Sequence, residues 1–405
     1  MGGKRRFELK IVLVSSWPPR HCGIATYSLD LVRALRKEGH EVHVVTFKDG
    51  GKRGEKDVHP VLKVRRNREL ADAGWDQKLF EAISRIEPDV VHIQHEYGLY
   101  LYDDDNSAGL LRAFFKWKVE SEVPVVVTYH SVYTVLDRVE AIYMDVALRL
   151  TSAAVVHEEY QKNLLPVNIG RVPDNVYVIP HGAKDVSPYP GAKEKLGLAG
   201  KKVVGLIGWW EPNKGFERVV KLWPKIRKEV GSKAVLVVAG DARPGSSSGQ
   251  NYKPKLLKAV ERCPAKKSIK VITGSFTPEE YDQVLSSFDL MVLPYSRASQ
   301  SGNLAHSFAL GVPCVATAME GLKAEVEASK AGLTVPPGDD LELRSAICHL
   351  MKHDALRKRY ARNASKYVTR QLKWSIVARK HVSLYSKLIC DLAEERKPRK
   401  KEWVC

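Results

Sequence analysis

Short apolar runs alternate with longer amphipathic segments along almost the whole chain, and no other feature constrains the fold as strongly. The first apolar run covers 9–15. A helical pattern follows it, in which Leu29, Val32 and Leu35 share one face, and a second apolar run covers 42–47. Apolar strands separated by amphipathic helices are typical of a parallel sheet that helices cover on both faces. We therefore predict an α/β fold.

The alternation continues through two series of segments, which predicts two domains. Further strands are expected at 89–93, 123–129, 153–157 and 176–179 in the first series and at 203–207, 234–239, 269–273, 289–293 and 312–316 in the second. Residues 182–200 have the Gly, Pro, Lys and Ser content of a hinge, and 245–249 has that of a flexible loop. Two Rossmann-like, doubly wound parallel sheets joined by a hinge would face a central cleft, with ligands beyond the carboxyl ends of the strands.

The domain bounds follow from this pattern. We expect a first domain over 1–182, a linker over 183–200, a second domain over 201–371, a C-terminal helix over 372–394 that crosses back to the first domain, and a basic tail over 395–405.

Charge narrows the class of partner. The chain carries 65 Lys and Arg against 47 Asp and Glu, a formal net charge of +18, which favours anionic lipid headgroups or phosphorylated substrates. No nucleic-acid-binding motif is present, so nucleic acid is the weaker candidate for the partner. A basic surface that is solvated and binds no anionic partner is the simplest alternative. With no long apolar run and six scattered cysteines, we predict a cytoplasmic protein, with peripheral contact at the inner membrane surface left open.

Small polar residues lead into the helix expected at 302–310. They are Ser299, Gln300, Ser301 and Gly302. Small residues let a ligand approach the backbone, and a helix start presents N–H groups that lack intrahelical partners. The arrangement favours an anion, often a phosphate, over the alternative of an ordinary helix cap.

A lysine stands at a second helix start. The segment 208–215 reads GWWEPNKG and joins a strand to the next helix, with Lys214 at the start of that helix. A lysine at a helix N-terminus opposes the helix dipole. The position therefore favours an anionic partner such as a diphosphate over a plain surface lysine.

Histidines follow two strands of the first series. His92 and His95 lie at the end of one strand and His130 at the end of the next. Histidines at strand carboxyl ends favour a functional role over simple packing. No further ligand completes a zinc site with His92 and His95, and the Asp-x-Asp pair in 103–105 reads as a solvated acidic loop, so no metal site is expected.

The loop after the first strand contains one glycine, Gly23, at the start of a helix. A nicotinamide or flavin site would need the pattern G-x-G-x-x-G, so no dinucleotide cofactor is expected. A glycine turn at a helix start suits a phosphate or sugar hydroxyls instead.

Taken in order, these segments resemble the retaining glycosyltransferases of family 4, which have the two-domain GT-B fold. The resemblance covers nearly the whole chain. It rests on the Pro-Pro-x-x-x-Gly loop at 18–23, "GHEVHVVT" at 39–46, "PDVVHIQHEYG" at 88–98, "VVVTYHS" at 125–131, "VIPHGA" at 178–183, "GWWEPNKGFE" at 208–217, "FDLMVLPY" at 288–295 and "ALGVPCVAT" at 309–317.

The resemblance implies transfer of a hexose from a nucleotide-diphosphate sugar, such as UDP-glucose or GDP-mannose, to a sugar, lipid-linked or phosphorylated acceptor. It implies retention at the anomeric carbon and no required cofactor or metal. The implied sites are His130 and His95 for catalysis; Lys214, Ser301, Gly302 and Gly23 for the donor diphosphate; His306, Ser299, Gln300 and Trp209 for the nucleotide and sugar; and Cys22, Tyr27 and Tyr97 for the acceptor side.

The chain departs from the family pattern at several of these places. The family's two glutamates would fall at Ala298 and His306, its arginine at Trp209, and its asparagine at His181. These departures keep three alternatives open: a glycan phosphorylase with pyridoxal phosphate on a lysine, a nucleotide-sugar epimerase that also cleaves the diphosphate bond, and a non-catalytic protein of the same fold that binds sugars or polyanions.

Overall fold

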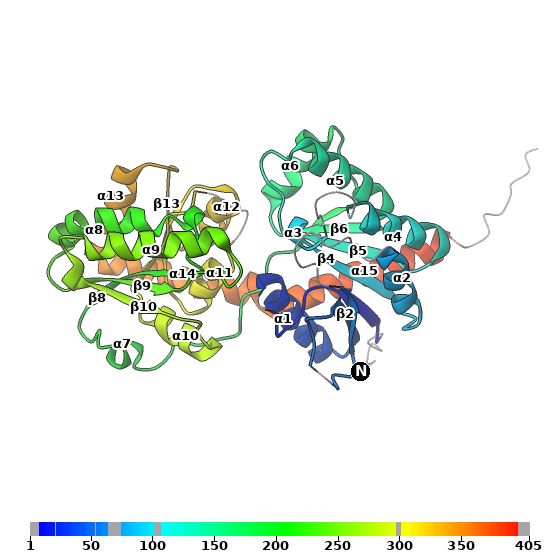
Figure 1. Ribbon diagram of the computed structural model, residues 1–405, viewed down its shortest axis with the longest axis horizontal. Helices are drawn as coiled ribbons and strands as arrows, with labels where there is room; N and C mark the ends of the chain where they lie inside the picture. The colour runs from blue at the N-terminus through cyan, green and yellow to red at the C-terminus, as the bar shows by residue number, and fades with distance from the viewer. Residues whose placement is uncertain are drawn as a thin grey trace, which may run out of the picture. The chain divides into compact units, whose positions relative to one another are not determined.

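The computed structural model describes residues 8–20, 22–52, 54–63, 74–100, 107–296 and 301–395 (Figure 1). The chain divides into two compact units. Unit 1 comprises 1–182 and 374–405, and unit 2 comprises 183–373.

Unit 1 contains a parallel sheet to which the described residues contribute seven strands, in the order β3-β2-β1-β4-β5-β6-β7. The strands are β1 (Lys10–Val14), β2 (Glu41–Phe47), β3 (Val58–Leu62), β4 (Val90–His95), β5 (Val125–Tyr129), β6 (Ala153–Val156) and β7 (Val176–Val178). The order of connection reverses between β1 and β4. The sequence pattern did not predict β3, because Pro60 interrupts it, and an edge strand tolerates a proline.

Helices cover both faces of this sheet. They are α1 (Gly23–Lys37), α2 (Trp75–Ser84), α3 (Tyr97–Tyr100), α4 (Ser107–Glu120), α5 (Arg138–Leu150), α6 (Glu159–Ile169) and α15 (Trp374–Glu395). Side chains of α1 and α15 pack with one set of strand residues, and those of α2, α4, α5 and α6 pack with the alternate set. In β4, for example, Val90 belongs to the first layer, and Val91 and Ile93 belong to the second.

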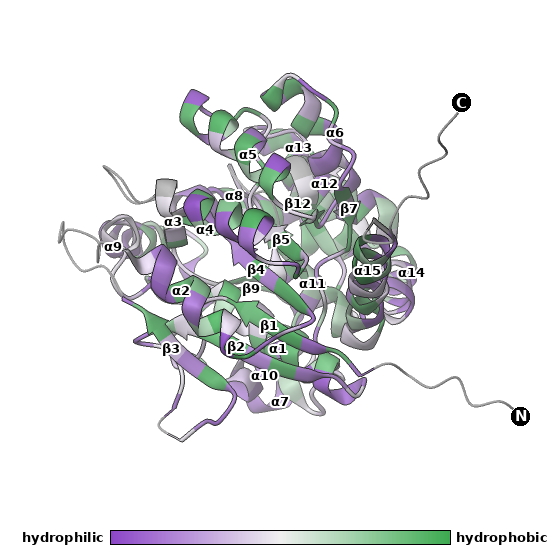
Figure 2. Ribbon diagram, turned by 90° about the vertical axis from the view of Figure 1, so that its right-hand side faces the viewer, coloured by the Kyte–Doolittle hydropathy of each residue, from purple (hydrophilic) through white to green (hydrophobic). Residues whose placement is uncertain are grey.

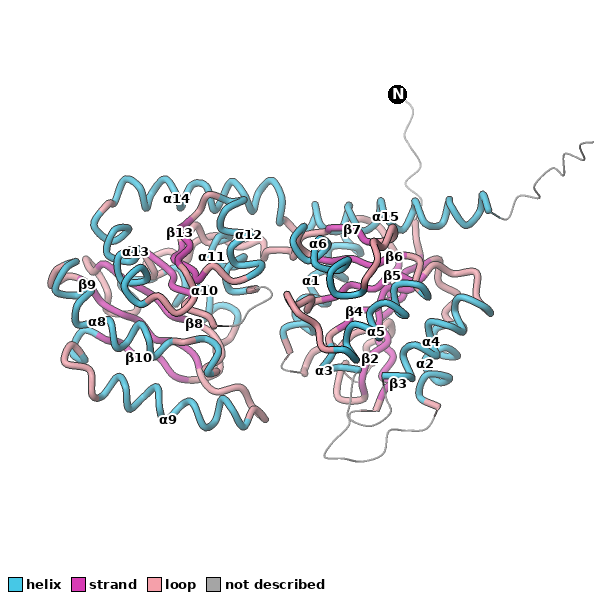
Figure 3. The backbone as a smooth tube through the Cα atoms, turned by 90° about the horizontal axis from the view of Figure 1, so that it is seen from above, coloured by secondary structure: helices cyan, strands magenta, loops and turns pink. Residues whose placement is uncertain are grey.

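Unit 2 contains a second parallel sheet, in the order β10-β9-β8-β11-β12-β13 for its described strands. The strands are β8 (Lys202–Ile207), β9 (Ala234–Gly240), β10 (Ile269–Thr273), β11 (Leu290–Leu293), β12 (Cys314–Thr317) and β13 (Gly332–Val335). The helices are α7 (Ala192–Lys195), α8 (Phe216–Val230), α9 (Ser247–Glu261), α10 (Pro278–Ser286), α11 (Gly302–Ala309), α12 (Glu320–Ser329), α13 (Asp340–Lys352) and α14 (Asp354–Tyr367), with a 3-10 turn at Pro212–Lys214 and a π turn at Val368–Leu372. Figure 3 shows α14 and α9 on opposite sides of these strands.

Hydropathy follows this layering. Figure 2 shows hydrophobic residues along β1 and β5, whereas helices such as α14 carry both hydrophobic and hydrophilic residues. Two doubly wound parallel sheets are the architecture that the strand and helix alternation predicts. Among the described helices, none is both long enough and apolar enough to cross a bilayer.

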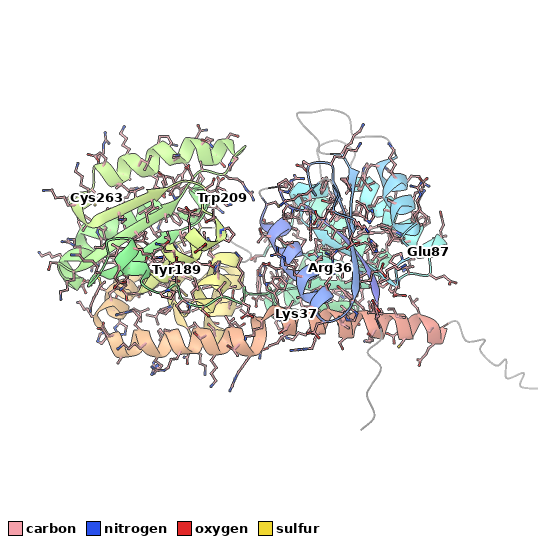
Figure 4. The ribbon with its side chains drawn as sticks, turned by 90° about the horizontal axis from the view of Figure 1, so that it is seen from below. Arg36, Lys37, Glu87, Tyr189, Trp209 and Cys263 are labelled. Atoms are coloured by element: carbon pink, nitrogen blue, oxygen red, sulfur yellow. The ribbon has the colours of Figure 1, made fainter. Side chains whose placement is uncertain are left out.

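The segment that was expected to be a hinge belongs to unit 2. Ala183 and Leu198 lie in the core of that unit. The backbone N–H of Tyr189, which is labelled in Figure 4, donates a hydrogen bond to Ser286 Oγ at 3.0 Å. The Gly and Pro content therefore indicated an irregular segment correctly, but the apolar residues of this segment pack in the core of unit 2.

The flexible loop expected at 245–249 is instead the start of α9. Ser246 caps the helix, since its side chain accepts a hydrogen bond from the backbone N–H of Gly249. Ser248 donates a hydrogen bond to Glu211 at 2.7 Å. Serines are frequent in loops because they bond to nearby backbone groups, and the same chemistry makes them good helix caps.

The first residue of α15 anchors this helix to unit 1. The ring of Trp374 lies 5.1 Å from that of Tyr27, centroid to centroid, at an interplanar angle of 70°. Gly182 passes so close to the indole that a Cβ atom at this position would overlap the ring. Glycine is therefore required at 182 by the close approach of backbone and indole.

We predict that Gly182→Ala lowers the free energy of unfolding by about 1–3 kcal/mol, because the added methyl group forces the indole of Trp374 aside. Urea unfolding of the purified protein measures this loss. In a Trp374→Ala background the same substitution should cost much less, because the obstacle is gone. An equal cost in both backgrounds would contradict the overlap as its cause.

Candidate functional site

Each sheet has one point at which its order of connection reverses, and loops from two neighbouring strands meet there. In unit 2 this point lies between β8 and β11, and in unit 1 between β1 and β4. Ligands of doubly wound sheets bind beyond the carboxyl ends of the strands at such points. Most of the site residues expected from the sequence lie on these four loops or at the helix starts that follow them.

Lys214 lies on the loop after β8 and contacts the loop after β11. Its Nζ atom sits 3.8 Å from the centre of the Tyr295 ring. The two loops are also joined by a hydrogen bond of 2.9 Å from the N–H of Ser296 to the carbonyl oxygen of Asn213. The lysine charge is thus held beside the chain that leads into α11.

Helix α11 begins without a side-chain cap. Ser301 occupies the cap position, is 8% exposed, and makes no capping hydrogen bond. Gly302 is the first helical residue and is exposed; a Cβ atom there would meet no described atom within 4 Å. Packing within the described part of the chain therefore does not demand a glycine at 302. Ser299, Gln300 and Ala298 lie outside the described residues.

The second residue of α11 ties the helix to β8. The Asn303 side chain donates a hydrogen bond to the carbonyl oxygen of Ile207 at 3.0 Å and accepts one from the Tyr281 hydroxyl at 2.7 Å. The adjacent Gly208 has φ +131°, and a Cβ atom on it would lie 2.5 Å from the Asn303 amide nitrogen. Trp209, labelled in Figure 4, follows this turn and is half-buried.

His306 lies one turn further along α11 and faces α10. Its Nε2 atom is 2.5 Å from Asp282 Oδ1. Its ring stacks on that of Tyr281, with centroids 5.2 Å apart and an angle of 27° between the planes. The sequence pattern identified His306 but did not identify Asp282, because the spacing between α10 and α11 is set by packing.

In unit 1 the corresponding helix start is that of α1. Cys22 is its cap residue and makes no side-chain capping bond, and Gly23 is its first helical residue. Ser16 Oγ donates a hydrogen bond of 3.5 Å to the Cys22 sulfur. As at 302, a Cβ atom on Gly23 would meet no described atom within 4 Å. Both helix starts leave room beside the backbone.

Tyr27, one turn into α1, is the centre of a ring cluster. It is 2% exposed, and four rings surround it at centroid distances of 4.8 to 5.4 Å. These rings belong to His130, His157, His181 and Trp374. We refer to these five residues as the Tyr27 cluster. Tyr27 thus supports His130 from inside unit 1.

The histidines of this cluster are held in the neutral form. Burial, followed by the proximity of His157 and His181, keeps the pKa of His130 well below its ordinary value of 6.5. Burial also lowers the pKa of His157 to about 3 and lowers that of His181. The imidazole of His130 is therefore uncharged at neutral pH and acts as a hydrogen-bonding group.

The side chain of His95 lies outside the Tyr27 cluster. From the sequence, His95 and His130 were expected to act together in catalysis, and the structure instead separates their side chains. The His95 side chain is 1% exposed, packs against the rings of four tyrosines, and burial lowers its pKa to about 3. The tyrosines are Tyr97, Tyr100, Tyr129 and Tyr143. His95 contacts His130 through the backbone, since its carbonyl oxygen accepts the N–H of His130 at 3.1 Å.

Alternation along the strands accounts for this difference. His95 pairs in register with Tyr129, so both side chains enter the layer of α4 and α5, and His130 is one residue further on. Tyr97, expected on the acceptor side, is 8% exposed and lies in the same layer as His95.

Sequence reasoning missed three residues that the structure places with His130. His157 follows β6 directly, the same signal that singled out His130, and Trp374 opens α15. Gln94 is the third, since His130 Nε2 lies 2.9 Å from Gln94 Oε1. The signal for Gln94 was its spacing of two residues from His92, which puts both on one face of β4.

The described part of the chain contains no cluster of side chains suited to binding a metal cation. No three His, Cys, Asp or Glu side chains converge there as a metal site would require. The acidic segment 103–105 lies outside the described residues.

Comparison with known proteins agrees with the architecture. Residues 22–185 match the model of Glycosyltransferase Family 4, and residues 191–367 match that of Glycosyl transferases group 1. The chain is 26% identical over 174 residues to alpha-D-kanosaminyltransferase of Streptomyces kanamyceticus, a match that covers 43% of this chain and 42% of that protein. It is 32% identical over 82 residues to phosphatidyl-myo-inositol mannosyltransferase of Mycobacterium leprae, covering 20% of this chain and 22% of the relative.

Solved structures share the fold over nearly the whole chain. Anabaena HepE in complex with UDP and glucose superposes with a TM-score of 0.73 at 18% identity, covering 94% of this chain and all of HepE. Sucrose-phosphate synthase of Thermosynechococcus elongatus superposes with a TM-score of 0.75 at 18% identity, covering 95% of this chain and all of that one. With two matched domains and a GT-B architecture, the chain belongs to the group 1 glycosyltransferases and carries a family 4 domain as its first unit.

Proposed function

We propose that the protein transfers a hexose from a nucleotide-diphosphate sugar, with UDP-glucose and GDP-mannose as candidate donors, to a sugar, lipid-linked or phosphorylated acceptor. The observation that carries the proposal lies at the switch point of unit 2. There α11 starts without a side-chain cap, on a glycine whose Cβ position meets no described atom, and Lys214 lies over Tyr295 on the neighbouring loop. The HepE complexes with UDP support a nucleotide donor.

The α11 start has what a diphosphate site needs. Its first N–H groups lack intrahelical partners, and the helix dipole places partial positive charge there. Lys214 adds a full charge, and Gly302 leaves room for phosphate oxygens. Gly23 is a second proposed contact for the donor. Charge develops on the diphosphate as the glycosidic bond breaks, so fixed donors at this place lower the barrier.

The nucleoside and sugar are proposed to contact Trp209, His306, Ser299 and Gln300. His306 lies next to the carboxylate of Asp282. A carboxylate suits the two adjacent hydroxyls of a ribose because it accepts hydrogen bonds through both oxygens. The pair would supply an acceptor at the position where His306 replaces a glutamate of the family pattern.

His130 is the proposed contact for the transferred sugar in unit 1, with Cys22 and the Tyr27 cluster on the acceptor side. A neutral imidazole stabilises the oxocarbenium-like transition state by hydrogen bonding and does not donate a proton as an acid. We propose retention by front-face displacement, in which the leaving phosphate takes the proton of the acceptor hydroxyl, and no metal takes part. This route requires no carboxylate nucleophile, which a covalent intermediate would need.

We also propose a cytoplasmic protein that contacts anionic membranes peripherally through α14. The exposed Lys358, Arg362 and Lys366 recur every four residues along this helix, whose one acidic residue is Asp354. Like charges at this spacing destabilise a helix by about 0.2–0.5 kcal/mol per pair, and an anionic surface removes that cost. Each basic residue near such a surface adds about 1 kcal/mol of attraction.

Gly302→Ala tests the diphosphate site directly. It should leave the unfolding temperature of the free protein unchanged or slightly higher, because the added methyl group meets no described atom and alanine restricts the unfolded chain. It should weaken donor binding by occupying the space of a phosphate oxygen. A thermal-shift series with UDP-, GDP- and ADP-sugars measures both. A donor at a hundred times its dissociation constant adds about 2.7 kcal/mol to wild-type stability.

Lys214→Ala should lower turnover much more than stability, whereas Lys221→Ala on the exposed side of α8 serves as the matched control. Unaltered donor binding in Gly302→Ala and unaltered turnover in Lys214→Ala would place the diphosphate elsewhere. If no nucleotide sugar shifts the wild-type protein, the non-catalytic binding protein is the better description.

The pH profile tests the role of His130. Because its pKa lies well below 6.5, His130 should contribute no limb with a midpoint near pH 6.5 to the pH profile of kcat/KM. Any limb seen there in the wild type should therefore persist in His130→Asn. His130→Asn should keep more turnover than His130→Ala, since an amide still forms hydrogen bonds. A limb near 6.5 that vanishes in His130→Asn would mean that the imidazolium is the active form.

Stability limits the pH range of that measurement. Histidines held neutral in the folded state take up protons near pH 6.5 once the chain unfolds, so their contribution is full above pH 6.5 and is lost as pH falls towards their folded pKa values. Rates should therefore be compared where the unfolding temperature is constant.

Membrane contact is measured by flotation with vesicles. The wild-type protein should float with phosphatidylglycerol-containing vesicles and remain free with pure phosphatidylcholine. The triple variant Lys358→Glu, Arg362→Glu, Lys366→Glu should stop floating. The control variant Lys221→Glu, Lys225→Glu, Lys228→Glu on α8 has the same change in charge, and if it loses flotation equally, net charge rather than α14 drives the contact.

A further inference from the structure

A chain of buried polar groups connects His130 with the C-terminal helix. His130 Nε2 lies 2.9 Å from Gln94 Oε1, and Gln94 Nε2 lies 3.1 Å from His92 Nε2. His92 Nδ1 lies 2.6 Å from the hydroxyl of Tyr385 on α15, and the Thr128 hydroxyl lies 2.7 Å from His92 Nε2. Gln94, His92, Thr128 and Tyr385 are each 0% exposed.

We propose that Gln94 is a positioning residue that determines which ring nitrogen of His130 carries the proton. The inference deepens the proposed function, because His130 is the residue proposed to contact the transferred sugar. Gln94 itself is fully buried and acts through His130.

The direction of each hydrogen bond follows from the chemistry of the amide. A carboxamide oxygen only accepts, so His130 must donate to it through Nε2–H, and a neutral ring then has its lone pair on Nδ1. The amide nitrogen only donates, so His92 Nε2 must accept from it, and the Thr128 hydroxyl, 2.7 Å from the same nitrogen, must donate to it as well. His92 therefore carries its proton on Nδ1 and donates it to the Tyr385 oxygen.

Because one end of an amide donates and the other accepts, the ring nitrogens of the two histidines that face Gln94 are locked in opposite states. One holds a proton and the other a lone pair. The far end is anchored on α15, where Tyr385 packs in the core of unit 1. The chain thus couples the tautomer of the half-buried His130 to that of the fully buried His92.

The strand pattern explains why these residues meet. His92 and Gln94 are two residues apart on β4, and Thr128 and His130 are two residues apart at the end of β5. In register, His92 pairs with Val126 and Gln94 with Thr128. Val90 and Val126 belong to the layer of α1 and α15, so the polar residues that follow them at a two-residue spacing point to the same side.

Nitrogen-15 NMR of histidine-labelled full-length protein tests the proposal without requiring any activity. His130 should be the Nε2–H tautomer, assigned by the signal that disappears in His130→Asn, and His92 should be the Nδ1–H tautomer. Gln94→Met removes both hydrogen bonds at similar volume, and His130 should then become a mixture of tautomers. Gln94→Glu keeps an acceptor for His130, so the Nε2–H form should persist.

Kinetics provides the second measurement. Gln94→Met should lower kcat about 10- to 100-fold with the KM for the donor changed less than twofold, and Gln94→Glu should recover part of the loss. Gln161→Met is the matched control. Gln161 is also a fully buried amide of unit 1, but it accepts hydrogen bonds from the backbone of His157 and Glu158. It should leave the His130 tautomer unaltered.

The possible results distinguish a failure of the proposed role of Gln94 from a failure of the proposed sugar transfer. A wild-type His130 in the Nδ1–H form, or a His130 tautomer that Gln94→Met leaves unaltered, overturns the role of Gln94. A tautomer that responds as expected in a protein that transfers no sugar supports the positioning role and rejects the proposed function alone.

Discussion

Every strand of a parallel sheet that is covered on both faces must distribute its side chains between two layers, and most features of unit 1 depend on this alternation. Odd and even positions of β4 enter different cores, one with α1 and α15 and the other with α4 and α5. A shift of one residue therefore separates His95 from His130, although both lie at the carboxyl edge. The same rule unites His92, Gln94 and His130 on one side.

The return of α15 to unit 1 completes this arrangement. Without it, one face of the first sheet would lack part of its cover, and His92 would lose the hydroxyl of Tyr385. Trp374 fixes the beginning of the helix against Tyr27 and requires Gly182 beneath it. Tyr385 of this helix, which is 293 residues from its partner His92, thereby supports the histidine that is proposed to contact the sugar.

The two units differ in the electrostatic character of their candidate binding groups. In unit 1, burial keeps the imidazoles of the Tyr27 cluster uncharged, which suits hydrogen bonding to sugar hydroxyls. In unit 2, the positive charge of Lys214 lies over the ring of Tyr295, on the loop after β11, and α11 starts without a side-chain cap. Both features suit a diphosphate. At both helix starts a Cβ atom on the glycine would meet no described atom within 4 Å, which leaves room for a ligand beside the backbone.

The sequence by itself determined the two α/β halves, the order of their elements and the polar residues at the strand ends, because hydrophobic periodicity and turn chemistry are local properties. It did not reveal β3, an edge strand that contains a proline, or the short strand β13, and it did not predict that α9 begins in the serines at 246–248. Only the tertiary structure decided which histidines meet, since that depends on strand register and on the packing of α15. It also decided that Asp282 faces His306 and that Gln94 faces His130, because these contacts join segments whose separation along the chain carries no local signal.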